Sequence, residues 1–332
     1  MKRFLDLADF SRDQVMDLLS LAQALQDRPD NRALAGKVLG LVFLNPSLRT
    51  LASFQAGMAR LGGSSFVIVP GQGTWQLETQ VGAIMNGVAA EHIREGIPAL
   101  ASYCDALGVR AFAEGKNLDT DLRETLFGMI DELCDKPLIN MESAMNHPCQ
   151  ALADWRSMDE LKIPQRAKFV LSWAYHPKPL PLAVPAATLH MAAMRGMEVV
   201  VLRPEGFALP RQVMDKARSA ATASGGAVSE TADRAAALKD ASVLYAKEWG
   251  TTTHYGDVQA DAKLRADLGD WCVREPWFAG ARPDARFMHC LPVRRNVAVA
   301  DEVLDGPRAM VKREAQNRLT VQMAVLHRML AG

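Results

Sequence analysis

Apolar and polar residues alternate with two different periodicities along this chain. Short runs rich in Val, Leu, Ile and Phe predict buried strands, and apolar residues three and four apart predict helices between them. The first helix is marked by a capping-box sequence from Ser11 to Gln14, followed by an apolar stripe that includes Val15, Leu18 and Leu19. Strands are expected at residues 38–44, 65–69, 106–111, 137–141, 168–173, 198–202, 242–246 and 286–290.

Strands that alternate with helices predict parallel sheets covered on both faces, which is the α/β class. The 332 residues exceed the length of about 250–300 at which one core stops growing. We therefore expect two doubly wound parallel-sheet domains, residues 1–146 and 147–311, joined by a hinge helix near 146–165. A last helix at 314–330 is expected to return to the first domain, which then includes residues 312–332.

Composition narrows the range of partners. The 38 Lys and Arg residues balance 38 Asp and Glu residues, so no net field favours nucleic acid or an anionic membrane. The five cysteines are scattered and form no C-x-x-C pair, which argues against a disulfide framework and a zinc site. No apolar run approaches the about 18 residues of a membrane span. These features predict a cytoplasmic protein that binds small molecules or copies of itself.

Polar clusters follow the predicted strands. Residues 45–50, Asn-Pro-Ser-Leu-Arg-Thr, open a helix directly after the strand at 38–44. The hydroxyls of Ser47 and Thr50, the Arg49 guanidinium and unpaired backbone N–H groups suit a phosphate, with an ordinary helix cap as the alternative. Ligands bind at the carboxyl ends of parallel strands. Further clusters stand there at Arg110, at Glu142 with 147–150, and at 173–178, 247–250 and 289–295.

Three ordered motifs carry a family resemblance. Ser-x-Arg-Thr at 47–50, His-Pro-x-Gln at 147–150 and His-Cys-Leu-Pro at 289–292 resemble the aspartate/ornithine carbamoyltransferase superfamily over essentially the whole chain. Segments such as Glu91-His92 and residues 140–142 resemble its N-acylornithine branch. The resemblance implies transfer of the carbamoyl group of carbamoyl phosphate to the δ-amine of an N-acyl-L-ornithine, in arginine biosynthesis. It also implies a homotrimer with shared active sites. No metal or organic cofactor is called for, because guanidinium groups and peptide dipoles can stabilise the anion.

The resemblance also assigns residues. The catalytic group is Arg110, His147, Gln150 and Cys290, of which Arg110 and His147 point at the carbonyl oxygen. Carbamoyl phosphate is assigned to Ser47, Leu48, Arg49, Thr50, Arg110, His147, Gln150, Leu291, Arg318 and, from a neighbouring subunit, Trp75. The acylornithine is assigned to Ala90, Glu142, His176, Lys247, Cys290, Leu291 and Arg294. Glu142 is expected either to bind the amide N–H or to orient its basic neighbours. No strong base stands ready for the attacking amine, so the departing phosphate is expected to accept its proton.

Two positions depart from the family pattern. Leu51 replaces a second arginine, and Ala90 replaces the glutamate of acetyl-specific or the proline of succinyl-specific enzymes. Ala90 lacks a carboxylate that would repel a succinyl group, which favours N-succinyl over N-acetyl-L-ornithine. The sequence leaves two roles possible for His92, a helix cap or a contact at the pocket.

Three alternatives to an N-acylornithine carbamoyltransferase remain. They are a carbamoyltransferase for another amine such as free ornithine or putrescine, a nucleotide-binding dehydrogenase and a non-catalytic binding protein.

Overall fold

The computed structural model describes residues 1–331, which divide into two compact units. Unit 1 contains residues 1–113, 119–149 and the C-terminal segment from 318. Unit 2 contains residues 114–118 and 150–317. Helices α6 (Pro148–Glu160) and α12 (Val311–Leu330) each contribute residues to both units.

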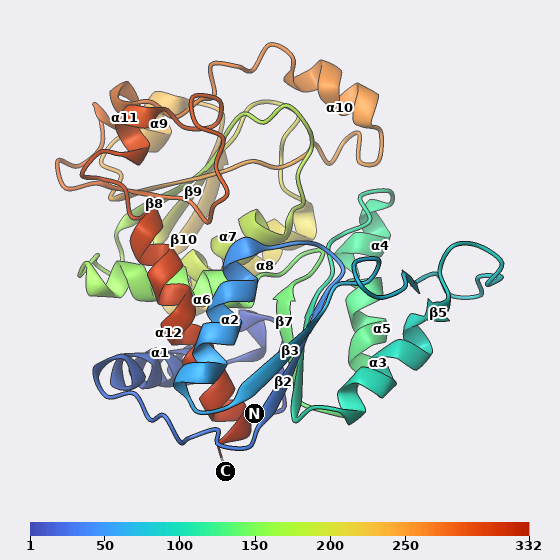
Figure 1. Ribbon diagram of the computed structural model, residues 1–332. Helices are drawn as coiled ribbons and strands as arrows, with labels where there is room; N and C mark the ends of the chain where they lie inside the picture. The colour runs from blue at the N-terminus through green and yellow to red at the C-terminus, as the bar shows by residue number, and fades with distance from the viewer. Residues whose placement is uncertain (332) are drawn as a thin grey trace. The chain divides into compact units, whose positions relative to one another are not determined.

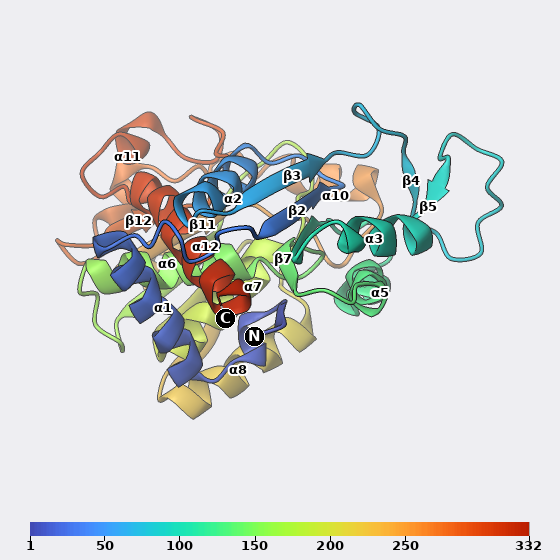
Figure 2. The same ribbon diagram turned by 60° about the horizontal axis from the view of Figure 1, so that its bottom comes forward.

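Unit 1 is built on a five-stranded parallel sheet in the order β1-β7-β6-β2-β3. Helices α3 and α5 lie side by side on one face, whereas α1, α2 and α12 gather on the other (Figures 1 and 2). Its strands are β1 (Arg3–Phe4), β2 (Val38–Phe43), β3 (Ser64–Ile68), β6 (Ala106–Arg110) and β7 (Leu138–Glu142). Its helical elements are η1 (Leu7–Asp9), α1 (Arg12–Asp27), α2 (Leu48–Arg60), α3 (Ile93–Ser102), α4 (Leu118–Leu122) and α5 (Thr125–Leu133).

Unit 2 contains a second five-stranded parallel sheet, in the order β10-β9-β8-β11-β12. Helices α7 and α8 pack together against β8, β9 and β10 (Figure 1). Its strands are β8 (Lys168–Trp173), β9 (Glu198–Leu202), β10 (Ala227–Thr231), β11 (Val243–Lys247) and β12 (Arg286–Met288). Its helical elements are α7 (Ala183–Arg195), α8 (Arg211–Ser224), α9 (Arg234–Leu238), α10 (Val258–Arg265), η2 (Glu275–Phe278) and α11 (Asp301–Leu304).

Each sheet has one point at which the strand order reverses direction. In unit 1 this point lies between β2 and β6, whose last paired residues are Phe43 and Arg110. In unit 2 it lies between β8 and β11, where Trp173 pairs with Lys247. Loops diverge at such a reversal and leave room for a ligand beyond the carboxyl ends of the strands. Four of the six polar clusters predicted from the sequence follow these strands, and the other two follow β7 and β12, their neighbours in the sheets.

A small parallel pair, β4 (Leu77–Glu78) and β5 (Glu91–His92), stands apart from both large sheets. The chain around it projects from the rest of unit 1 (Figures 1 and 2). Several large apolar side chains are exposed on this projecting segment, namely Trp75, Val81, Ile84, Met85 and Val88. The pair β4–β5 and the residues that lead into and connect it, 70–92, are called the projecting segment below.

The predicted fold class is confirmed. Two parallel-sheet α/β units are present, and α12 contacts α1 and α2 of the N-terminal part as well as α6. Gly57 of α2 faces α12, where a Cβ would lie 3.4 Å from the Met323 side chain, an ordinary van der Waals contact. The capping box at Ser11 is formed, with Gln14 returning its side chain to the backbone N–H of Ser11.

Some element ends differ from those predicted. The helix expected at 146–165 runs only from Pro148 to Glu160, since proline suits the first turn and the chain then turns at residues 161–166. The last helix begins at Val311, earlier than predicted. Strands β1 and β10 were not predicted, because β1 has two residues and β10 is a largely exposed edge strand without an apolar run.

Candidate active site

The start of α2 forms an anion-binding geometry in unit 1. Ser47 is the N-cap, and its hydroxyl accepts a hydrogen bond from the Thr50 backbone N–H at 3.3 Å and donates to the Thr50 hydroxyl at 3.0 Å. Arg318 of α12 donates from Nη2 to the same Thr50 hydroxyl at 3.0 Å, and both side chains are buried. Backbone N–H groups of the first helical turn and the positive end of the helix dipole favour an anion here. The Leu48 side chain is 79% exposed, so only its backbone can contribute.

Arg110 and Glu142 end neighbouring strands and form a buried ion pair. His147 places Nε2 3.4 Å from the same carboxylate oxygen of Glu142. All three residues are buried, each less than one-tenth exposed. Of the two roles expected for Glu142, this geometry favours the orientation of its basic neighbours.

His147 is an uncharged group at neutral pH. Burial and then the positive charges of Arg318, Arg110 and Arg49 hold the pKa of His147 well below its usual value. A neutral imidazole offers one N–H donor and one acceptor. Its Nδ1 is buried and has no hydrogen-bond partner within residues 1–331. The positive potential at this site therefore comes from the three guanidinium groups and the helix dipole.

The chain before Ser47 is fixed to the end of β6. The Asn45 side-chain oxygen accepts from the Phe112 backbone N–H at 2.8 Å, and the Leu44 backbone N–H donates to the Arg110 carbonyl at 3.0 Å. The Arg110 guanidinium carbon also lies 4.5 Å from the centroid of the Phe112 ring. These contacts set the position of the α2 start relative to Arg110.

In unit 2, a relay of hydrogen bonds supports Lys247 and the turn after β12. Lys247 Nζ lies 2.8 Å from Glu248, and His289 Nε2 lies 3.3 Å from the other oxygen of that carboxylate. The Leu291 backbone N–H donates to His289 Nδ1 at 2.9 Å, so Nδ1 is the acceptor and Nε2 carries the proton toward Glu248. Lys247 and His289 hold the pKa of buried Glu248 below its usual range against the opposing effect of desolvation.

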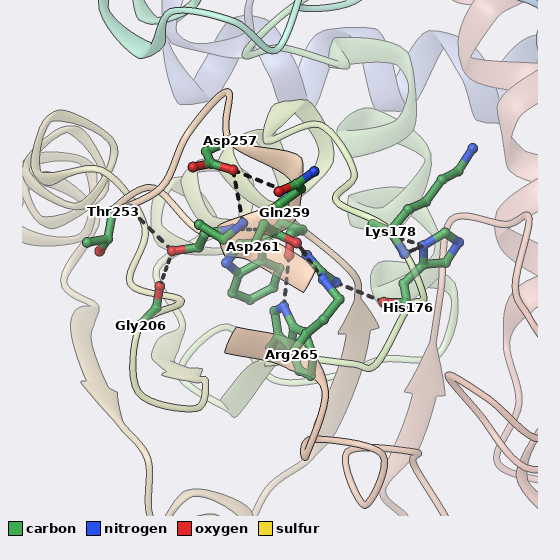
Figure 3. A network of polar contacts seen from close by, with 12 residues as sticks. His176, Lys178, Gly206, Thr253, Asp257, Gln259, Asp261 and Arg265 are labelled. Atoms are coloured by element: carbon green, nitrogen blue, oxygen red, sulfur yellow. Dashed lines mark hydrogen bonds and ion pairs between the residues drawn. The ribbon is translucent and has the colours of Figure 1, made fainter. Parts of the chain in front are cut away.

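His176 lies in a second network of unit 2, which Figure 3 shows from close by. Arg265 forms a buried ion pair with Asp261 and donates from Nη1 to the His176 carbonyl at 2.8 Å. Arg294 Nε donates to His176 Nε2 at 2.9 Å, so the ring proton is on Nδ1, 2.7 Å from the Lys178 carbonyl. Arg294 is thereby oriented by a buried ring while its own side chain stays accessible.

Gln150 and the turn at 289–291 also lie in unit 2. Gln150 donates from Nε2 to Asp154 at 2.7 Å, one helical turn farther along α6. Its side-chain oxygen is therefore the atom that can accept from an amide. Cys290 is buried beside Leu291, whose backbone has a positive φ of 56°.

The remaining predicted residues lie on the projecting segment. Trp75 is 59% exposed and donates from its indole nitrogen to Glu91 at 2.6 Å. Ala90 is exposed immediately before Glu91. His92 is the N-cap of α3 and accepts from the Arg94 backbone N–H at 3.1 Å, as expected for a helix cap.

The predicted residues thus fall into three sets, one in unit 1, one in unit 2 and one on the projecting segment. Unit 1 brings together Ser47, Thr50, Arg110, Glu142, His147 and Arg318, with Arg49 close enough to act on His147; unit 2 supports Lys247, Leu291, His176 and Arg294 on its two networks. Sequence reasoning missed the supporting acid Asp154, and it gave no role to Glu248 or His289, although both lie in the polar clusters at 247–250 and 289–295. The i, i+4 spacing of Gln150 and Asp154 was the available signal for Asp154.

Residues 1–331 contain neither a metal-binding cluster nor a membrane-spanning helix. No group of three or more His, Cys, Asp or Glu side chains in this range could hold a metal ion. None of its helices is both long enough and apolar enough to cross a membrane.

Comparison with known families gives matches over both halves of the chain. The carbamoyl-P binding domain of aspartate/ornithine carbamoyltransferase matches residues 2–160, and the Asp/Orn binding domain matches residues 184–329. The N-acetylornithine carbamoyltransferase of Xanthomonas axonopodis pv. citri is 36% identical over 98% of this chain and 96% of its own length. The N-succinylornithine carbamoyltransferase of Bacteroides thetaiotaomicron is 36% identical over 89% of this chain and 88% of its own length.

A solved structure supports the same grouping. Acetylornithine transcarbamylase in complex with acetylcitrulline superposes with a TM-score of 0.95 at 36% identity, covering 100% of both chains. Sequence, domain order and fold agree over the full length of the chain. The chain belongs to the aspartate/ornithine carbamoyltransferase family, in its N-acylornithine branch.

Proposed function

We propose that the protein transfers the carbamoyl group of carbamoyl phosphate to the δ-amine of an N-acyl-L-ornithine, N-succinyl-L-ornithine in preference to N-acetyl-L-ornithine. The products are N-acyl-L-citrulline and phosphate. The observation that carries the proposal is the start of α2, where Ser47, Thr50 and Arg318 are hydrogen-bonded around a helix N-terminus. A doubly charged phosphate fits this positive, donor-rich site.

The residues of unit 1 act on the donor. Arg49, Ser47, Thr50, Arg318 and backbone N–H groups bind the phosphate and stabilise it as it leaves. Arg110, held by Glu142, is directed at the carbonyl oxygen, on which negative charge develops when the amine adds to the carbonyl carbon. Uncharged His147 acts on the same oxygen by donating its single ring N–H. The buried carboxylate of Glu142 keeps both groups oriented before substrate arrives.

The residues of unit 2 act on the acceptor and on the carbamoyl NH₂. The Gln150 side-chain oxygen and the Leu291 carbonyl accept from the NH₂, while Lys247 and Arg294 bind the α-carboxylate. The δ-nitrogen forms a bond to the carbamoyl carbon, the bond from that carbon to the phosphate oxygen breaks, and the departing phosphate takes the proton from nitrogen. An unperturbed alkylamine has a pKa of about 10.4, so the proton must leave during the reaction.

Ala90 supports the choice of a succinyl group. The resemblance expects glutamate at this position in acetyl-specific enzymes, and alanine removes its charge. An N-acetyl-L-ornithine transcarbamylase in which one glutamate is replaced by alanine has been solved with carbamyl phosphate and N-succinyl-L-norvaline. That structure matches this chain with a TM-score of 0.94 at 37% identity, covering 99% of this chain and 100% of the other. A succinyl carboxylate thus meets no like charge at Ala90.

Kinetics with three amines test the proposal. Purified protein is assayed with carbamoyl phosphate and ornithine, N-acetyl-L-ornithine or N-succinyl-L-ornithine. We expect the largest kcat/KM for N-succinyl-L-ornithine, and we expect Ala90→Glu to lower that value more than the value for the acetyl compound. Ala89→Glu, one residue earlier, is the matched control. A higher kcat/KM for acetylornithine would overturn the succinyl choice, and turnover of ornithine alone would overturn the branch.

A homotrimer with shared active sites is part of the proposal. The large apolar side chains of the projecting segment are exposed in the single chain, with Ile84 at 83% and Val88 at 84%. A cluster of such side chains on one segment suits burial against another subunit. Trp75 lies on the same segment and is proposed to reach the phosphate of a neighbouring subunit. We place this reaction in arginine biosynthesis in the cytoplasm.

A further inference from the structure

Two acids that no assigned role uses are buried next to the predicted carbamoyl contacts of unit 2. Asp154 of α6 and Glu314 of α12 are 0% and 1% exposed. Asp154 accepts from Gln150 Nε2 at 2.7 Å through one oxygen and from the Tyr245 hydroxyl at 3.0 Å through the other. Glu314 accepts from the His289 backbone N–H at 3.1 Å. The two acids thus hold both Gln150 and the turn that carries Leu291.

The two acids are buried close enough to affect one another. Glu314 Oε1 meets no donor group within residues 1–331, and the charge of Asp154 acts on this carboxyl group. Two ionised carboxylates buried at one site repel one another, so we expect one of them to hold a proton. Burial, and then the charge of Asp154, raise the pKa of Glu314 well above its usual value. The neighbouring titratable groups are Tyr245, Cys290 and His289; burial raises the pKa of Tyr245, so it remains a phenol that donates.

We propose that Asp154 and Glu314 are positioning residues of the transfer site, which share one proton and together orient the Gln150 amide and the turn at His289–Leu291. This inference rests on the proposed function, which assigns the Gln150 oxygen and the Leu291 carbonyl to the carbamoyl NH₂. The pair fixes both acceptors from one point: Asp154 binds the Gln150 nitrogen and so sets the direction of its oxygen, and Glu314 anchors the backbone two residues before Leu291. The shared proton keeps this buried pair at a single negative charge, which two ionised acids would double.

Asp154→Ala tests the orienting role. Alanine removes both acceptor oxygens, so neither the Gln150 amide nor the Tyr245 hydroxyl keeps its partner on α6. We expect kcat to fall on the order of 10²-fold, as for a displaced substrate contact. Binding of inorganic phosphate, which depends on unit 1, should stay at the wild-type Kd in a calorimeter. Asp233→Ala, which removes an exposed carboxylate at the N-cap of α9 and should cost about 1 kcal/mol of stability without loss of kcat, is the control.

Glu314 variants test the shared proton. Glutamine retains one donor for Asp154 and one acceptor for the His289 N–H, so Glu314→Gln should recover most of the kcat that Glu314→Ala loses. Infrared spectra of the wild type should show the carbonyl stretch of a buried protonated carboxyl group, and Glu314→Gln should remove it. The spectra need no substrate, so they test the acid pair independently of catalysis. Absence of carbamoyl transfer would refute the proposed function, but it would leave the result of the spectra unchanged. Wild-type kcat in Asp154→Ala, or the same carboxyl band in Glu314→Gln as in the wild type, would overturn the inference.

Discussion

Replacing Glu142 with glutamine removes a carboxylate that serves both Arg110 and His147. In the ion pair, the two side chains are only 9% and 10% exposed. Removal of one partner from a buried pair leaves an uncompensated charge and costs about 3–5 kcal/mol of unfolding free energy. The charges of Arg49 and Arg318 act at the same site, so the loss of Glu142 also makes the site more positive. We therefore expect a less stable protein with a higher affinity for phosphate.

The assay is equilibrium unfolding in urea, with and without inorganic phosphate. Without phosphate, Glu142→Gln should lose about 3–5 kcal/mol relative to wild type. A ligand at about 100 times its Kd adds roughly 2.7 kcal/mol to the free energy of unfolding. If the variant binds phosphate more tightly, the same phosphate concentration should stabilise the variant more than the wild type. The control is Glu132→Gln, an exposed position on α5 that should stay within about 0.5 kcal/mol of wild type. Stability equal to the control, or an equal phosphate effect in variant and wild type, would refute the reasoning.

Three further predictions concern activity, pH and assembly. Arg49→Ala should reduce kcat on the order of 10²-fold or more, as loss of a group that stabilises the leaving phosphate does, and near-normal turnover would contradict its role. The lowered pKa of His147 means that the unfolded chain takes up a proton before the folded one does. Wild-type stability should therefore fall as the pH drops below about 6.5, by up to about 1.4 kcal/mol per pH unit, and unfolding titrations of His147→Gln should lack this component. Mixing Trp75→Ala with Arg49→Ala subunits, after dissociation and reassembly, should restore turnover that neither variant has alone; additive activities would argue against shared sites.

Hydrophobic patterning was sufficient to predict the central strands of the fold. Strands 168–173 and 198–202 have the predicted bounds, because each is an apolar run buried in the middle of a sheet. Patterning could not locate β10, since an edge strand with exposed side chains has no such run. It also could not define the start of α12 at Val311, where charged residues form the first turn.

The sequence predicted the part of the candidate site whose interacting residues lie close together in one segment. The Ser47 and Thr50 contact is local to one helix start, and the strand order places Arg110 beside it. The acids that orient the site depend on tertiary structure instead. Glu314 meets His289 only because α12 packs there, and a glutamate in a helix gives no sign in the sequence that its carboxyl group is buried.

The most direct test of the account is the stoichiometry of the reaction. Wild-type protein incubated with carbamoyl phosphate and N-succinyl-L-ornithine should form N-succinyl-L-citrulline and phosphate in equal amounts, and omission of the amine should stop phosphate release above the spontaneous rate. Phosphate release without formation of an N-acylcitrulline, or no product with either acylornithine, would contradict the account.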